Sequence, residues 1–219
     1  MPSEKNFFLD GQIRELLTHK LMMFPHYLRG IRDVEYVRQM LRAEEYRDKW
    51  RNLEVTYIWG ATGLGKTRSV MDGYGYSNVY AVNDYKHPFD GYAKESVMLF
   101  DEFNSGFRIQ DMNNYLDGYP ITLPARYSNK QACYETVFII SNLDLRKQYV
   151  REQTEESEVW KAFLRRIHKV IHFMPDGSRL EYATTDYFTA NDDWVKLSDD
   201  SYFPLDDVTQ KEGENDVRR

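Results

Sequence analysis

Eight consecutive residues in the first third of the chain have the types and spacing that bind nucleotide phosphates. They fit the pattern glycine, any four residues, glycine, lysine, and serine or threonine, directly after an apolar run at 55–59. Glycine lets successive backbone N–H groups face a phosphate, and the start of a helix adds a favourable dipole. The lysine supplies charge to the β- and γ-phosphates, and the threonine hydroxyl can bind magnesium. A glycine-rich turn without a ligand is the alternative, but every position matches in the required context. The expected nucleotide-binding residues are Gly60, Ala61, Thr62, Gly63, Leu64, Gly65, Lys66 and Thr67.

Two adjacent carboxylates, Asp101 and Glu102, end a second apolar run at 97–100. In a parallel α/β sheet the carboxyl ends of the strands meet at the ligand-binding edge. We expect Asp101 to hold a magnesium ion there and Glu102 to polarise the water that attacks the nucleotide. A solvated acidic turn is the alternative, and the phosphate-binding pattern upstream argues against it.

Asn142 ends a third apolar run, at 136–141. A neutral donor at that strand end could hydrogen-bond the γ-phosphate or the attacking water. Taken alone, serine and asparagine after a strand more often form an ordinary turn. This prediction therefore depends on the two other motifs.

The residues around these motifs predict alternating strands and helices. Runs of β-branched and aromatic residues predict strands near 55–59, 79–83, 96–100 and 136–141, and apolar spacing predicts helices near 66–74, 109–116 and 157–166. Such alternation is typical of a mostly parallel sheet covered on both faces. The expected fold class is α/β: a P-loop NTPase with a mostly parallel sheet and flanking helices.

Periodicity and charge divide the chain into three parts. Apolar repeats at helical spacing predict a small helical domain over 1–50, ahead of an ATPase domain over 51–190. Residues 191–219 hold nine carboxylates and four basic side chains, which predicts an acidic, mobile tail. That tail accounts for −5 of the net charge of −6, so the other 190 residues are nearly neutral. A neutral body can still line one channel with cations, because phosphate attraction is local.

Composition narrows the class of protein. A hydrophobic content of 42% and an aromatic content of 15% can supply a buried core. A single cysteine excludes an internal disulfide framework and a multi-cysteine zinc site, and fits a reducing compartment. We find no secretory signal and no apolar run long enough to span a bilayer, so no membrane partner is expected.

The order and spacing of the three motifs resemble those of superfamily 3 helicases. The resemblance is closest to the ATPase domain of Rep proteins from circular single-stranded DNA viruses and related bacterial plasmids. Residues 116–124, followed by 126–130, look like that family's extra motif before the third strand, and 160–167 look like its arginine-finger segment. The similarity covers about 45–175.

The resemblance implies an AAA+-like motor of a rolling-circle replication initiator. It implies ATP and Mg²⁺ as cofactors, single-stranded DNA as partner, and a hexameric homo-oligomeric ring with ATP sites between subunits. Glu102 and Asn142 would then act in hydrolysis, and Thr67 and Asp101 would hold Mg²⁺. The opening helices correspond in position to an oligomerisation domain. The expected location is the cytoplasm of a bacterial host, or the host nucleus for a eukaryotic virus.

The same resemblance assigns roles to four basic residues. Arg165 or Arg166 would be the finger that completes a neighbouring subunit's site, and the other arginine would be structural or on the surface. Lys130, with Arg126 as a weaker candidate, would contact DNA phosphates. A solvated hairpin tip is the alternative for this second pair.

One feature of full-length Rep proteins is missing, because no histidine-hydrophobe-histidine motif occurs. His168 and His172 lie four apart and are expected to be ordinary residues, so these residues give no basis for assigning endonuclease activity. Three other functions stay open: a P-loop kinase, a non-translocating ATPase such as a helicase loader or nucleotide-gated scaffold, and an RNA helicase of the same superfamily. Adjacent carboxylates and a strand-end asparagine favour water activation over the kinase.

Overall fold

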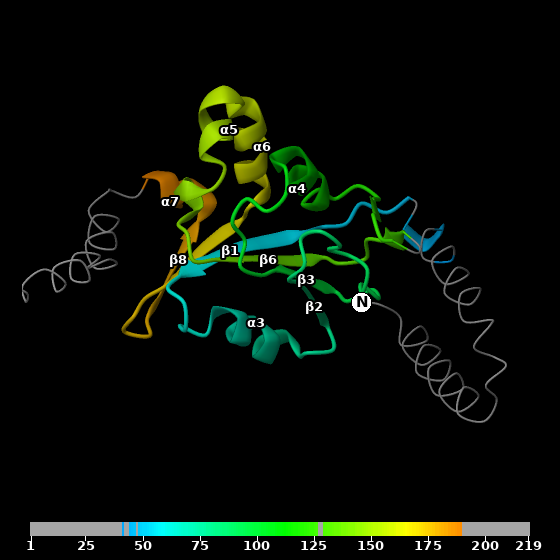
Figure 1. The fold of residues 1–219 in the computed structure, drawn as a ribbon, viewed down its shortest axis with the longest axis horizontal. Helices are drawn as coiled ribbons and strands as arrows, with labels where there is room; N and C mark the ends of the chain where they lie inside the picture. The colour runs from blue at the N-terminus through cyan, green and yellow to red at the C-terminus, as the bar shows by residue number, and fades with distance from the viewer. Residues whose placement is uncertain (1–40, 42–43, 47, 127–128, 190–219) are drawn as a thin grey trace, which may run out of the picture.

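Buried β-branched and aromatic runs form a central six-stranded sheet, which Figure 1 shows edge-on between helices. The computed structural model describes residues 41, 44–46, 48–126 and 129–189. The strand order is β2–β3–β6–β1–β7–β8; the first five strands are parallel, and β8 is antiparallel to β7. The predicted mostly parallel sheet is therefore confirmed. Its strands are β1 (Glu54–Gly60), β2 (Val79–Val82), β3 (Val97–Phe100), β6 (Thr136–Ser141), β7 (Lys169–Phe173) and β8 (Arg179–Ala183).

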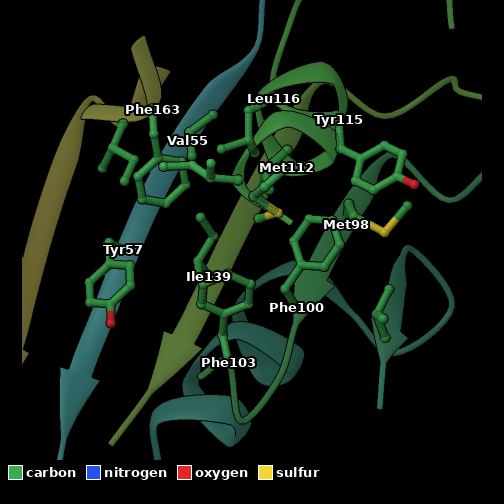
Figure 2. Close-up of a cluster of buried hydrophobic side chains, with 14 of the residues drawn as sticks. Val55, Tyr57, Met98, Phe100, Phe103, Met112, Tyr115, Leu116, Ile139 and Phe163 are labelled. Carbon is green, nitrogen blue, oxygen red and sulfur yellow. The ribbon is translucent and has the colours of Figure 1, made fainter. Parts of the chain in front are cut away.

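Both faces of the sheet are apolar, because alternate side chains of each central strand enter different cores. On β1, Val55 and Tyr57 belong to the larger core, whereas Ile58 belongs to the smaller one. Figure 2 shows the larger core, where Met112 and Leu116 lie against side chains of the sheet. Strands buried on both faces are expected in a parallel sheet, since helices cover each side.

Helices flank the sheet as predicted. The helix α3 (Lys66–Tyr74) covers the smaller core, and α4 (Ile109–Tyr115), α5 (Val150–Glu155) and α6 (Ser157–Arg166) lie on the opposite side in Figure 1. The predicted bounds of α3 and α6 match those observed, and α4 ends one residue earlier than predicted. The buried residues of α6 are Trp160 and Phe163, three apart, which is the spacing of one helical face.

Several short or polar elements were not predicted. These are the strands β4 (Thr122–Leu123), β5 (Lys130–Gln131), β7 and β8, the 3₁₀ turn η2 (Leu145–Lys147), and the helices α5 and α7 (Thr184–Thr189). Strand β8 alternates exposed and half-buried positions, and α5 has no buried residue, so neither gives a strong apolar signal. Two-residue strands such as β4 and β5 are too short for any periodicity.

Most of the predicted helical domain over 1–50, and all of the predicted acidic tail over 191–219, lie outside the described residues. In the part of the chain that is described, no helix combines the length and apolar character needed to cross a bilayer.

Candidate nucleotide-binding and hydrolysis site

The phosphate-binding loop leaves the central strand β1 through a glycine that no other residue can replace without strain. Gly60 has φ +143°, and a Cβ there would lie 2.4 Å from the carbonyl oxygen of Phe173 on the neighbouring strand β7. Gly63 and Gly65 have φ values of +82° and +77°, in the left-handed region that favours glycine. The helix α3 then begins at Lys66. The loop therefore has the strand–loop–helix context that its sequence pattern requires.

The Lys66 ammonium group lies at the centre of this loop. Its Nζ donates to the carbonyl oxygens of Gly60 at 2.6 Å and Ala61 at 2.5 Å, and to Oδ1 of Asn142 at 2.9 Å. Burial lowers the pKa of Lys66, and the negative charges of Asp101 and Glu102 act in the opposite direction. Neutral oxygens thus hold the ammonium group in place, and one of them comes from the strand-end asparagine.

The contact between Lys66 and Asn142 follows from strand order. Strand β6, which ends just before Asn142, pairs with β1 on one side and β3 on the other. Since all three strands are parallel, their carboxyl ends reach the same edge of the sheet. The three predicted motifs therefore meet there, although they are far apart in the sequence.

Thr67 and Asp101 form the second link between motifs. The Thr67 hydroxyl donates to Oδ1 of Asp101 at 2.9 Å, which joins the start of α3 to the end of β3. A hydroxyl and a carboxylate oxygen are hard ligands that fit Mg²⁺, which typically takes one or two protein oxygens and fills its other positions with water and phosphate. The hydroxyl of Tyr85, a residue not predicted for the site, donates to the Asp101 backbone carbonyl at 2.8 Å.

Glu102 has an uncommon backbone conformation for its type. Its φ is +49°, and its backbone N–H donates to Oδ1 of Asp101 at 3.1 Å. Its side chain is exposed, whereas Asp101 is half-buried. The left-handed turn separates the two carboxylates, so Asp101 faces Thr67 while Glu102 is open to solvent. A non-glycine residue in this region is strained, and such strain clusters at functional sites.

The two arginines at the end of α6 have different surroundings. Arg166 forms an ion pair with Asp117, just after α4, and its Nη1 donates to the Ala162 carbonyl at 2.7 Å. Its guanidinium group holds the pKa of Asp117 below the usual range, against the effect of burial. Arg165 is exposed, and its charge also helps to lower the pKa of Asp117.

The two predicted DNA contacts lie on one small hairpin. Lys130 begins β5, and Arg126 lies in the connection between β4 and β5, where residues 127–128 are outside the described part. The backbone N–H of Arg126 donates to Oδ1 of Asp90 at 2.9 Å, and its Nε forms an ion pair with Oδ2 of the same carboxylate. Arg126 therefore already has an anionic partner within its own chain.

Comparison with known proteins gives matches over the same region. The model of a family described as RNA helicase matches residues 56–143. The replication-associated protein of canary circovirus is 28% identical over 162 residues, which cover 73% of this chain and 50% of that protein. The corresponding protein of a human-associated cyclovirus is 24% identical over 72% of this chain and 55% of its own length. That of goose circovirus is 28% identical over 67% of this chain and 46% of its own length.

A mostly parallel sheet with a phosphate-binding loop and two further motifs on adjacent strand ends defines an α/β fold of the P-loop NTPase type. The matches confirm the predicted resemblance to the superfamily 3 helicase domain of viral Rep proteins. The chain spans about half the length of the curated relatives it matches.

Proposed function

We propose that this chain is the ATP-dependent DNA helicase or translocase motor of a rolling-circle replication initiator. The supporting observation is the convergence of three motifs, through the Lys66–Asn142 and Thr67–Asp101 contacts, at one edge of the sheet. The names of the similar viral proteins connect that site with replication.

In this proposal each residue has a separate task. Backbone N–H groups of residues 60–67 and the Lys66 ammonium group bind the ATP phosphates, and Thr67 with Asp101 holds Mg²⁺. The exposed Glu102 carboxylate accepts a proton from the attacking water, and Asn142 orients that water or the γ-phosphate. Magnesium supplies charge neutralisation on the β- and γ-phosphates.

The positions of the other proposed basic residues are consistent with a ring-shaped assembly of subunits. Arg165, exposed at the end of α6, reaches toward the ATP of an adjacent subunit, while Arg166 stabilises its own subunit through Asp117. The hairpin with Arg126 and Lys130 contacts single-stranded DNA in the centre. A hexamer, and the host compartment, follow from the family resemblance.

The decisive experiment measures ATP hydrolysis by the full chain with and without single-stranded DNA, together with its mass in the presence of an ATP analogue. DNA-stimulated hydrolysis by a ring, coupled to unwinding, supports the proposal. Nucleotide-dependent assembly without unwinding would instead support a loader or scaffold. Stronger stimulation by RNA than by DNA would support the RNA helicase that the family description names.

Two substitutions separate binding from chemistry. Lys66→Ala should weaken ATP binding and abolish hydrolysis, because the loop loses its phosphate-binding cation. Glu102→Gln should keep ATP binding but slow turnover by about 10²–10⁴-fold, because it removes only the general base. Equilibrium binding of a fluorescent ATP analogue and phosphate release measure the two effects. Near-normal turnover of Lys66→Ala, or loss of binding in Glu102→Gln, would contradict these roles.

A further inference from the structure

A fully buried side-chain amide lies next to the turns that carry Glu102 and Asn142. Gln148, between η2 and α5, is 0% exposed. Its Nε2 lies 2.9 Å from the Tyr57 hydroxyl, 3.0 Å from the Ser141 hydroxyl and 3.1 Å from the Phe103 carbonyl, and its two protons are shared among these three acceptors. Its Oε1 accepts from the backbone N–H of Ser105 at 2.9 Å and from the Ser105 hydroxyl at 2.8 Å. A buried amide is costly unless it is satisfied, and both ends of this one are occupied.

The partners of Gln148 flank the proposed catalytic residues. Phe103 directly follows Glu102, and Ser141 directly precedes Asn142. The same two partners are joined to each other, because the Ser141 hydroxyl donates to the Phe103 carbonyl at 2.7 Å. The amide therefore connects the turn that carries the general base to the turn that carries the phosphate-sensing asparagine.

The third partner fixes this connection to the rigid centre of the sheet. Figure 2 shows Tyr57 on β1, with its hydroxyl directed toward the carboxyl end of the strand. That hydroxyl donates to the Leu143 carbonyl at 2.8 Å and accepts from Gln148. Residues from β1, from β6 and from the turn after β3 thus share one buried network.

Backbone strain is concentrated around the same amide. Glu102, Ser105 and Tyr149 have φ values of +49°, +48° and +51°, uncommon for residues other than glycine. Gln148 binds Ser105 directly, and the Tyr149 backbone N–H donates to the Ser105 hydroxyl at 2.9 Å. Strained conformations persist only where surrounding contacts over-determine them. The hydrogen bonds of Gln148 supply such contacts.

We propose that Gln148 is a positioning residue for ATP hydrolysis, which sets the relative orientation of the Glu102 and Asn142 turns without touching the nucleotide. This inference rests on the proposed function of the site. A residue that supports a catalytic group through hydrogen bonds typically changes activity by about 10- to 100-fold. Because the phosphate-binding loop does not contact Gln148, ATP binding is expected to be nearly unchanged.

The test uses Gln148→Met, which keeps length and apolar volume but removes the amide. We expect kcat to fall by about 10- to 100-fold while the affinity for an ATP analogue stays close to that of the unsubstituted chain. The matched control is Tyr134→Phe, which removes another fully buried donor, bound to the Tyr115 carbonyl away from the site. Equal losses of kcat in the two variants would overturn the proposal. If Gln148→Met does not fold, Ser105→Ala deletes one partner and should change kcat in the same direction.

A second measurement separates positioning from general loss of structure. In a Glu102→Gln background, Gln148→Met should cause a smaller further loss of single-turnover rate than in the unsubstituted chain, because one of the two groups it positions is already gone. A full multiplicative loss in that background would overturn the inference. Binding of ADP with aluminium fluoride, a transition-state analogue, should weaken more than binding of ADP alone.

Different experimental outcomes would show that the role of Gln148 is wrong and that the proposed function is wrong. If the unsubstituted chain binds the transition-state analogue more tightly than ADP, and Gln148→Met does so equally, only the role of Gln148 is wrong. If the unsubstituted chain binds neither ATP nor the analogue, the proposed function is wrong and the role of Gln148 falls with it.

Discussion

Arg126, Arg165 and Arg166 carry the same guanidinium group, and their neighbours decide what each can contact. Arg126 pairs with Asp90 and is 56% exposed, whereas Arg166 pairs with Asp117 and is only 17% exposed. Arg165 is exposed at the end of α6. The carboxylate of Asp90 accepts from Arg126 as a phosphate would, so DNA must displace it before Arg126 can bind the backbone. The family resemblance makes Lys130 the stronger candidate for the proposed phosphate contact.

At this scale we predict that Asp90→Asn strengthens single-stranded DNA binding. Removing the competing anion should raise affinity by about two- to fivefold at low salt, since an exposed ion pair contributes little. Fluorescence anisotropy with a labelled oligonucleotide measures the change.

The Arg126→Ala background provides the control for this prediction. In that background, Asp90→Asn removes one negative charge but releases no arginine. The gain in DNA affinity should therefore be only the small one expected from losing that charge. Lys130→Ala should reduce the dependence of log affinity on log salt by about 0.7, the value for one phosphate contact on a single strand. An unchanged salt dependence in the Arg126→Ala, Lys130→Ala double variant would indicate a solvated hairpin tip instead.

At the scale of elements, the pairing of β1 with β7 places a histidine beside the phosphate-binding loop. Trp59 and His172 are register partners, and their rings stack at 3.6 Å between centroids with 5° between planes. Burial lowers the pKa of His172 to about 4, although the negative charge of Asp144 acts in the opposite direction. The folded protein therefore keeps this ring neutral.

The pKa of His172 predicts a loss of stability in mild acid. An unfolded histidine takes up a proton near pH 6.5, whereas the folded one resists until about pH 4, so stability is lost as pH falls through this window. Each unit of pKa difference corresponds to about 1.4 kcal/mol, so a loss of roughly 1–3 kcal/mol is expected.

Urea unfolding at pH 7 and at pH 4.5 measures this loss. His172→Phe keeps an aromatic ring against Trp59 and cannot titrate, so its free energy of unfolding should fall less between the two pH values. If both proteins lose stability equally, the ring of His172 does not determine the acid sensitivity.

At the scale of the whole molecule, the proposed function requires a second cation at the nucleotide, supplied by another subunit. Within the described residues Lys66 is the cation bonded to the phosphate-binding loop, and Arg165 and Arg166 lie on a separate helix. An arginine on a transferring phosphate contributes about a thousandfold or more to the rate. Hydrolysis that depends on such a residue from a second subunit requires assembly.

Mixing two inactive variants tests this dependence. Arg165→Ala and Lys66→Ala should each be nearly inactive, and a mixture should regain activity, because some interfaces join an intact loop to an intact finger. Phosphate release by the mixture measures the effect.

Arg166→Ala distinguishes the two arginines. It should lower the free energy of unfolding by about 1–3 kcal/mol, because Asp117 is left without its hydrogen-bonded charge partner. Full activity of Arg165→Ala alone would exclude it as a finger. A mixture that assembles but stays inactive would indicate that Arg165 acts within its own subunit.

Local chemistry was sufficient to predict the strands β1, β2, β3 and β6, the two long helices and the three strand-end motifs. The glycines of residues 60–67 determine the backbone conformation of that loop locally. The runs that form β1, β3 and β6 are buried on both faces, so each is recognisable as a continuous apolar segment. Strand β8 and helix α5 were missed because their side chains are mostly exposed.

The sequence by itself determined which groups are present for nucleotide chemistry and the order in which they occur. Only the tertiary structure decided their partners: Asn142 on Lys66, Asp90 on Arg126, and Gln148 between two catalytic turns. Lys66 and Asn142 are 76 residues apart, Asp90 and Arg126 are 36 apart, and Gln148 and Phe103 are 45 apart, so no local periodicity encodes these contacts. The order of the parallel strands makes the ends that carry Lys66 and Asn142 neighbours, and packing of the separate β4–β5 hairpin brings Arg126 to Asp90.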